Sequence, residues 1–159
     1  MKRTVALLME NQPGALSRVV GLFSQRGYNI ESLIVAATED PSLSRLTMTT
    51  SGDQKVIEQI TKQLNKLIDV VKVLDLGESD YVERELLLVK FLHGSIQTEV
   101  IKELNGEIIF ENNELFNIQF VGTSKELDQV LKDLESSNPL EIVRTGASGI
   151  SSNLKTLTI

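Results

Sequence analysis

Apolar residues recur along the first half of the chain with two alternating periods. Short runs with apolar side chains at alternate or consecutive positions predict β-strands, and longer stretches with apolar side chains three or four residues apart predict helices. The predicted strands cover residues 3–9, 28–37, 45–51 and 70–74, and the predicted helices cover residues 14–26 and 54–67. The order βαββαβ is typical of an α+β ferredoxin-like domain, in which two helices cover one face of a four-stranded antiparallel sheet.

The same order of elements recurs after a short polar segment. Residues 77–83 lack a periodic pattern, and we interpret them as a linker between a domain at 1–76 and a second ferredoxin-like domain at 84–159. In the second domain the predicted strands cover residues 86–91, 107–111, 115–121 and 140–144, and the predicted helices cover residues 95–104 and 124–134. From Gly146 onward apolar residues are isolated among serines, which predicts a tail that is mobile without a partner.

Local signals mark several helix ends. Gly27 follows the last periodic residue of the first helix, where helices favour a residue in the left-handed conformation. Ser51 and Gln54 have the spacing of a capping box ahead of the second helix, and Thr123 and Glu126 have the same spacing ahead of the last one.

Composition narrows the classes of partner. The 159 residues carry a net charge of −6, which argues against a nucleic-acid partner, and no apolar run is long enough to span a membrane. The chain has no cysteine and its first residues do not form a signal peptide, so we expect a cytoplasmic protein. Only two tyrosines and five phenylalanines are present, and a thin aliphatic core of this kind favours pairing with another chain.

Catalytic chemistry has little support in the sequence. The only histidine, His93, lies at a predicted strand end, where a solvated loop residue is expected. The acidic pairs Glu83/Glu85 and Glu39/Asp40 are interpreted as solvated charges. The chain has no nucleophile-elbow, phosphate-loop or metal-ligand spacing, so we predict neither a catalytic residue nor a metal site.

The loop between the first strand and the first helix is the best candidate for a binding site. Backbone N–H groups of Gly14, Ala15 and Leu16 lie at a predicted helix start, where a carboxylate is favoured. The Asn11 amide offers both a donor and an acceptor to the charged ends of a free amino acid. Neighbouring apolar residues favour an aliphatic amino acid. The alternative is a turn that the fold requires and that binds nothing.

The stretch N-Q-P-G-A-L-S-R-V-V-G-L-F-S-Q-R-G-Y-N-I-E-S-L closely resembles the start of the small, regulatory subunit of acetolactate (acetohydroxyacid) synthase. The resemblance continues through Leu43–Arg45 and the V-E-R-E-L-L-L-V-K run at 82–90. It also includes F-V-G-T-S at 120–124 and I-V-R-T-G at 142–146. It implies that the N-terminal domain is an ACT domain, a ferredoxin-like module that binds amino acids.

The resemblance also implies a non-catalytic role in the biosynthesis of branched-chain amino acids. The partner implied is a large catalytic subunit that carries thiamine diphosphate, a divalent metal and FAD, whereas this chain carries no cofactor. The small subunit would raise the partner's activity and confer feedback inhibition by valine, bound where the ACT sheets of a homodimer meet. The residues that match the family's site are Asn11, Gly14, Ala15 and Leu16 in the loop, with Asn29 and Ile30 contributed across the dimer interface. The alternative function is a stand-alone amino-acid sensor that acts on another enzyme or a transporter.

Overall fold

A computed structural model describes residues 2–78 and 80–158, and its chain divides into two compact units. The first unit contains the residues up to Val82 together with those from Ala147 onward, and the second contains Glu83–Gly146. The sequence instead predicts a linker at 77–83 and a second domain that extends to the last residue. The structure thus assigns the C-terminal segment to the first unit.

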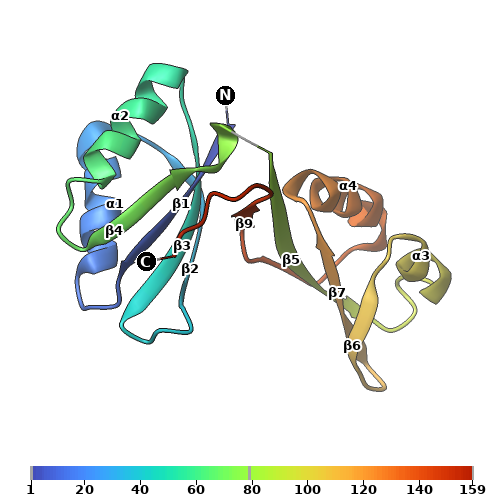
Figure 1. Ribbon diagram of the computed structural model, residues 1–159. Helices are drawn as coiled ribbons and strands as arrows, with labels where there is room; N and C mark the ends of the chain where they lie inside the picture. Colours follow the sequence, from blue (N-terminus) through green and yellow to red (C-terminus); the bar gives the residue numbers. More distant parts are fainter. Residues whose placement is uncertain (1, 79, 159) are drawn as a thin grey trace. The chain divides into compact units, whose positions relative to one another are not determined.

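The first unit has the predicted βαββαβ order (Figure 1). Its elements are β1 (Lys2–Glu10), α1 (Ala15–Arg26), β2 (Ile30–Ala37), β3 (Leu43–Ser51), α2 (Gln54–Leu64) and β4 (Val70–Asp75). The antiparallel strands lie in the order β2-β3-β1-β4, so β1 is central and β2 is an edge strand. Both helices cover one face of this sheet, and the prediction of a ferredoxin-like fold is confirmed.

The core of the first unit lies between the helices and the sheet. Val5 and Leu7 of β1 are fully buried there, together with Phe23 of α1 and Ile60 of α2. Burial of each such side chain stabilises the unit by about 1.5–3 kcal/mol. Alternate β1 residues enter this core because neighbouring side chains of a strand point to opposite faces.

The structure at the end of α1 and at the start of α2 can be compared with the stop signal and the capping box predicted there. Gly27 ends α1 in the left-handed conformation, with φ of 69°, as predicted. The capping box predicted at Ser51 and Gln54 is wrong, because the side chain of Asp53 accepts a hydrogen bond from the Val56 N–H and caps α2. Ser51 remains the last residue of β3, where its hydroxyl donates to Glu31.

The face of the first sheet opposite the helices is covered by the C-terminal segment. A short 3-10 turn, η1 (Leu76–Glu78), and strand β9 (Ser148–Ser151) contact β1 there. Leu157 is only 6% exposed and packs with the fully buried Ala6 and Leu76. The Arg45 guanidinium donates to the Gly149 carbonyl at 2.7 Å. Parts of the segment that the sequence predicts to be a mobile tail, β9 and Leu157, are therefore packed in the structure, whereas Leu154 is fully exposed.

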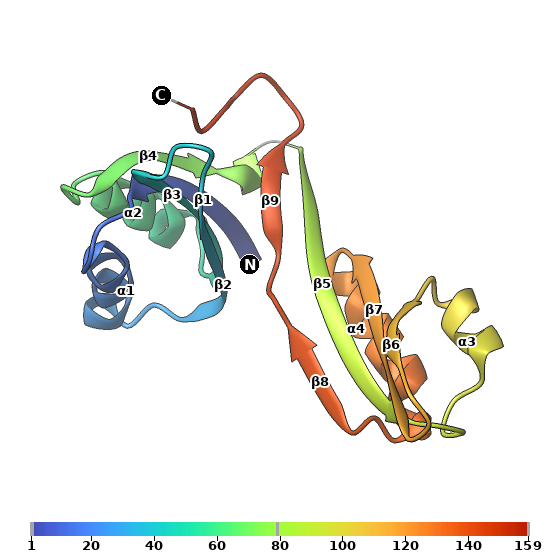
Figure 2. The same ribbon diagram turned by 90° about the horizontal axis from the view of Figure 1, so that it is seen from below.

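The second unit repeats the same plan around its own core (Figure 2). Its strands are β5 (Tyr81–Leu92), β6 (Glu107–Glu111), β7 (Leu115–Gly122) and β8 (Glu141–Arg144), in the order β6-β7-β5-β8, and its helices are α3 (Thr98–Glu103), α4 (Ser124–Leu134) and the 3-10 turn η2 (Glu135–Ser137). The predicted capping box of Thr123 and Glu126 is confirmed at the start of α4.

Candidate functional site

The candidate loop connects the end of β1 to the start of α1. Gly14 precedes the helix with φ of 88°, a left-handed conformation that glycine adopts without steric cost. The Ala15 N–H donates to the Gln12 carbonyl at 3.2 Å, and residues 11–14 are exposed. The Ala15 side chain is buried, whereas Leu16 packs partly against the core. The four loop residues predicted from the sequence therefore lie together.

Asn11 anchors one side of this loop. Its N–H donates to the Ser42 carbonyl at 2.7 Å, and its side-chain amide donates to the Pro41 carbonyl at 2.9 Å. The sequence assigned this amide to a ligand carboxylate, whereas the structure uses it to hold the loop against the β2–β3 turn. The prediction that the Asn11 side-chain oxygen accepts from an ammonium group stays a prediction.

An ion pair that sequence reasoning missed fixes the other side of the loop. The Arg18 guanidinium, on the first turn of α1, binds the Asp69 carboxylate through Nε and through Nη2, the latter at 2.7 Å. The hydrogen bond from Arg18 holds the pKa of Asp69 below its ordinary value, and the same bond raises the pKa of Arg18. The two residues are 51 positions apart, and no local pattern indicates their pairing.

Asn29 and Ile30 lie at the opposite end of the same sheet. Ile30 pairs with Thr50 of β3, and Thr50 pairs with Arg3 near the start of β1, whereas the loop follows the end of β1. The distance along β2 from Ile30 to Ala37 is roughly 24 Å at about 3.4 Å per residue. A single chain therefore does not bring these two residues to the loop.

Strand β2 has the properties of an edge that pairs with another chain. One side of it bonds to β3, and it carries no proline or lysine. After Glu31 it contains only serine and apolar residues, and Val35 is 37% exposed. Unprotected edges of this kind are templates for strand addition.

His93 and Glu85 are both interpreted from the sequence as solvated residues, but only His93 is well exposed to solvent. His93 follows the end of β5 with its side chain 41% exposed and lies 3.2 Å from Glu111, as expected for a solvated loop residue. Glu85 contradicts its interpretation as a solvated charge, because it is 4% exposed and bound by Arg144 and Ser124. Among residues 2–78 and 80–158, no three histidine or acidic side chains form a metal-binding group.

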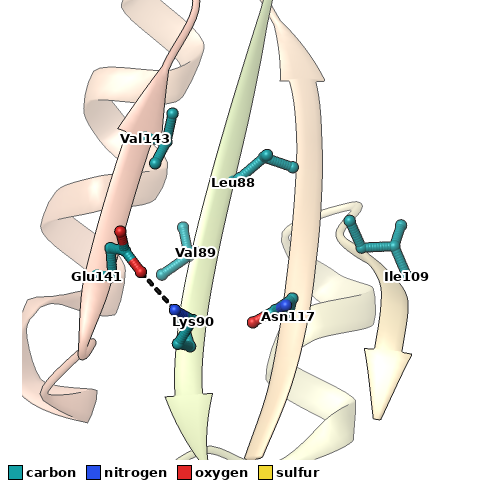
Figure 3. Close-up of a pocket in the computed structure, with 7 residues that line it drawn as sticks. All are labelled: Leu88, Val89, Lys90, Ile109, Asn117, Glu141 and Val143. Atoms are coloured by element: carbon teal, nitrogen blue, oxygen red, sulfur yellow. Dashed lines mark hydrogen bonds and ion pairs between the residues drawn. The ribbon is translucent and has the colours of Figure 1, made fainter.

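A pocket on the second sheet offers no comparable chemistry (Figure 3). Leu88, Ile109 and Val143 supply an apolar lining from three strands. Lys90 and Glu141 form an ion pair across β5 and β8, so their charges neutralise each other. The residues drawn in this pocket lack the set of donors that would hold both charged ends of an amino acid.

The family models and the relatives of this chain agree with the resemblance in its sequence. A model described as AHAS small subunit-like ACT domain matches residues 5–72, and one described as small subunit of acetolactate synthase matches residues 84–153. The acetolactate synthase isozyme 3 small subunit of Salmonella typhimurium is 49% identical over 156 residues, covering 95% of this chain and 96% of that protein. The chain belongs to the acetolactate synthase small-subunit family.

Other members of the small-subunit family support this assignment. The Escherichia coli isozyme 3 small subunit is 48% identical over 95% of this chain and 96% of its own length. The crystal structure of the small subunit from Thermotoga maritima matches with a TM-score of 0.85 and 36% identity, covering 94% of this chain and 96% of that one. The N-terminal domain is thus an ACT domain, and membership supports a regulatory role beside a larger subunit. In the described part of the chain, no helix is long and apolar enough to cross a membrane.

Proposed function

We propose that this chain is a non-catalytic, cytoplasmic subunit that activates a large acetolactate synthase subunit and makes it sensitive to valine. Valine binds in this proposal at a site shared by two copies of the chain. The larger subunit supplies the catalytic centre with its thiamine diphosphate, divalent metal and FAD. The membership of the small-subunit family supports the partnership, and the geometry of the first sheet supports the shared site.

The observation that carries the shared site is the separation of the predicted residues along the sheet. Antiparallel pairing of two β2 edges about a two-fold axis places the start of one strand beside the end of the other. The end of β2 lies close to the loop, because Ala37 pairs with Ser44 and Ser44 pairs with Met9. Asn29 and Ile30 of one copy then meet the loop of the other copy.

The chemistry of the two halves matches a small aliphatic amino acid. The loop contributes the backbone N–H groups of Gly14 and Leu16 at a helix start, since the Ala15 N–H donates to Gln12, and such groups favour a carboxylate. The Asn11 oxygen accepts from an ammonium group. Leu16 and Ile30 are partly buried apolar residues that pack against the core of the first unit, and they provide the surface for an aliphatic side chain. These groups favour valine over a charged amino acid.

Titration of a mixture of both subunits tests the proposal. The large subunit alone has low activity in this account, and addition of the chain raises it. Valine then lowers the activity of the complex towards that of the large subunit alone. The chain without the large subunit forms no acetolactate from pyruvate, and purified chain that converts pyruvate by itself contradicts the proposal. Co-purification of another enzyme or a transporter instead of a thiamine-dependent protein favours the stand-alone sensor.

A further inference from the structure

Both ends of the candidate loop are tied to one residue, Asp69, which lies just before β4. The N–H of Glu10, the residue before the loop, donates to the Asp69 carbonyl at 2.8 Å. Arg18, four residues after the loop, binds the Asp69 carboxylate through two nitrogens. The backbone and the side chain of a single residue therefore fix where the loop begins and where the helix after it starts.

The Arg18–Asp69 pair has the geometry of a rigid attachment. Two parallel hydrogen bonds from a guanidinium to a carboxylate set orientation as well as distance. The Asp69 side chain is 6% exposed, whereas the Arg18 side chain is 47% exposed. The Arg18 guanidinium also lies above Gly14, since Nη1 is 2.9 Å from the position that a Cβ on Gly14 would occupy. Arg18 thus fills the space next to the one loop residue with a left-handed backbone.

We propose that Arg18, Asp69 and the Glu10–Asp69 hydrogen bond form a clasp that holds the effector loop in its binding conformation. Arg18 and Asp69 are positioning residues in this proposal, and they do not contact the effector. The proposal rests on the proposed function, because it assigns valine binding to this loop. A loop that is already ordered loses less conformational entropy when a ligand binds, so the clasp raises affinity without adding a contact.

The clasp has a matched control in the second unit. Arg144 binds Glu85 through two nitrogens at 2.7 and 2.9 Å, and the Glu85 side chain is 4% exposed. This pair has the same two-nitrogen geometry and similar burial of its acid, although Arg144 also binds Asp128 and Glu85 also accepts from Ser124. It lies in a unit that lacks the loop. Glu85→Gln therefore reproduces the loss of a buried ion pair without touching the clasp.

The experiment compares Asp69→Asn, Arg18→Lys and Glu85→Gln in the full chain, each mixed with the large subunit. Asp69→Asn removes the negative charge of the carboxylate. Arg18→Lys keeps the positive charge at position 18 but cannot form the bidentate hydrogen bonds of a guanidinium. We expect both to raise the valine concentration for half-inhibition by about three- to tenfold while the maximal activation stays at the wild-type level. Glu85→Gln leaves the half-inhibition concentration unchanged.

Hydrogen exchange of the loop amides, measured without valine, provides a second readout. We expect the amides of residues 10–16 to exchange faster in Asp69→Asn and Arg18→Lys, and at the wild-type rate in Glu85→Gln. Unchanged exchange in both clasp variants overturns the clasp, and so does faster exchange with a wild-type half-inhibition concentration. A wild-type complex that valine does not inhibit refutes the proposed function instead, and the exchange rates still decide whether the clasp orders the loop. If Asp69→Asn fails to fold, Arg18→Lys carries the test.

Discussion

Replacement of Gly14 by aspartate tests whether the loop before α1 holds the carboxylate of an amino acid. Gly14 has φ of 88° and ψ of −15°, a conformation that costs a residue with a Cβ roughly 1–2 kcal/mol. The new Cβ would lie 2.9 Å from Nη1 of Arg18, the end of a flexible side chain that has to move. Gly14→Asp therefore alters the geometry of the loop as well as its charge.

The repulsion between the carboxylate that Gly14→Asp introduces and the ligand carboxylate is larger than the conformational cost of the new Cβ. Two negative charges about 4 Å apart repel by roughly 4 kcal/mol at an effective dielectric constant of about 20. Solvent and the neighbouring Arg18 guanidinium offset part of this repulsion. Half of it, about 2 kcal/mol, still weakens valine binding more than tenfold, because about 1.4 kcal/mol corresponds to a factor of ten.

Gly14→Asn separates charge from shape. Asparagine has the size of aspartate, carries no charge and tolerates the left-handed conformation better than most residues. Activation and valine inhibition are measured on the same preparation of the large subunit, with circular dichroism to verify folding. Gly14→Asp is expected to activate the large subunit and to lose inhibition, and Gly14→Asn is expected to keep most of it. A folded Gly14→Asp variant with the wild-type half-inhibition concentration refutes a carboxylate site at Gly14.

Three further substitutions test other parts of the structure. Val35→Lys places a charge on the β2 edge and is expected to convert dimers to monomers in sedimentation at micromolar concentration; a dimer as tight as wild type contradicts pairing through β2. Leu157→Ala is expected to lower the free energy of unfolding by about 2–4 kcal/mol in denaturant titrations, whereas a mobile tail predicts no change. Glu85→Gln is expected to lower the free energy of unfolding by about 1.5–3 kcal/mol at pH 7, the range for hydrogen bonds to charged groups. Burial opposes ionisation of Glu85, but the bonds from Arg144 and Ser124 outweigh it and hold its pKa below the ordinary value. The stabilisation is therefore complete above about pH 4.3 and disappears as the pH falls through the lowered pKa, so a difference from wild type that persists at low pH argues against the ion pair.

The sequence predicts the elements of both units because their apolar periodicity is strong. The helix faces of α1 and α2 repeat every three to four residues, and β1 is apolar on both faces, as its central position requires. The C-terminal segment has no period, so its packing is not predictable from pattern. Leu157 is an isolated apolar residue whose burial depends on Ala6 and Leu76, which are far away in the sequence.

The candidate site is predictable only in part for a similar reason. Loop residues such as Gly14 and Asn11 can be identified from the sequence, because they favour a turn and because they match the motif of a known family. Arg18 and Asp69 are ordinary charged residues in the sequence, and only the register of β4 beside β1 brings Asp69 to the loop. Ser51 likewise matches a capping box by spacing, but its pairing with Lys2 at the end of β3 outweighs that local preference.

Mixing two defective variants tests the shared site most directly. Gly14→Asp damages the loop, and Asn29→Ala damages the part that a second copy contributes. Each variant alone is expected to activate the large subunit without valine inhibition. When equal amounts exchange partners, about half of the dimers contain one chain of each kind, and each mixed dimer has one intact site and one doubly damaged site. The account predicts that valine inhibition reappears in the mixture. A mixture in which sedimentation and affinity tags demonstrate mixed dimers, yet valine has no effect, contradicts a site shared between two chains.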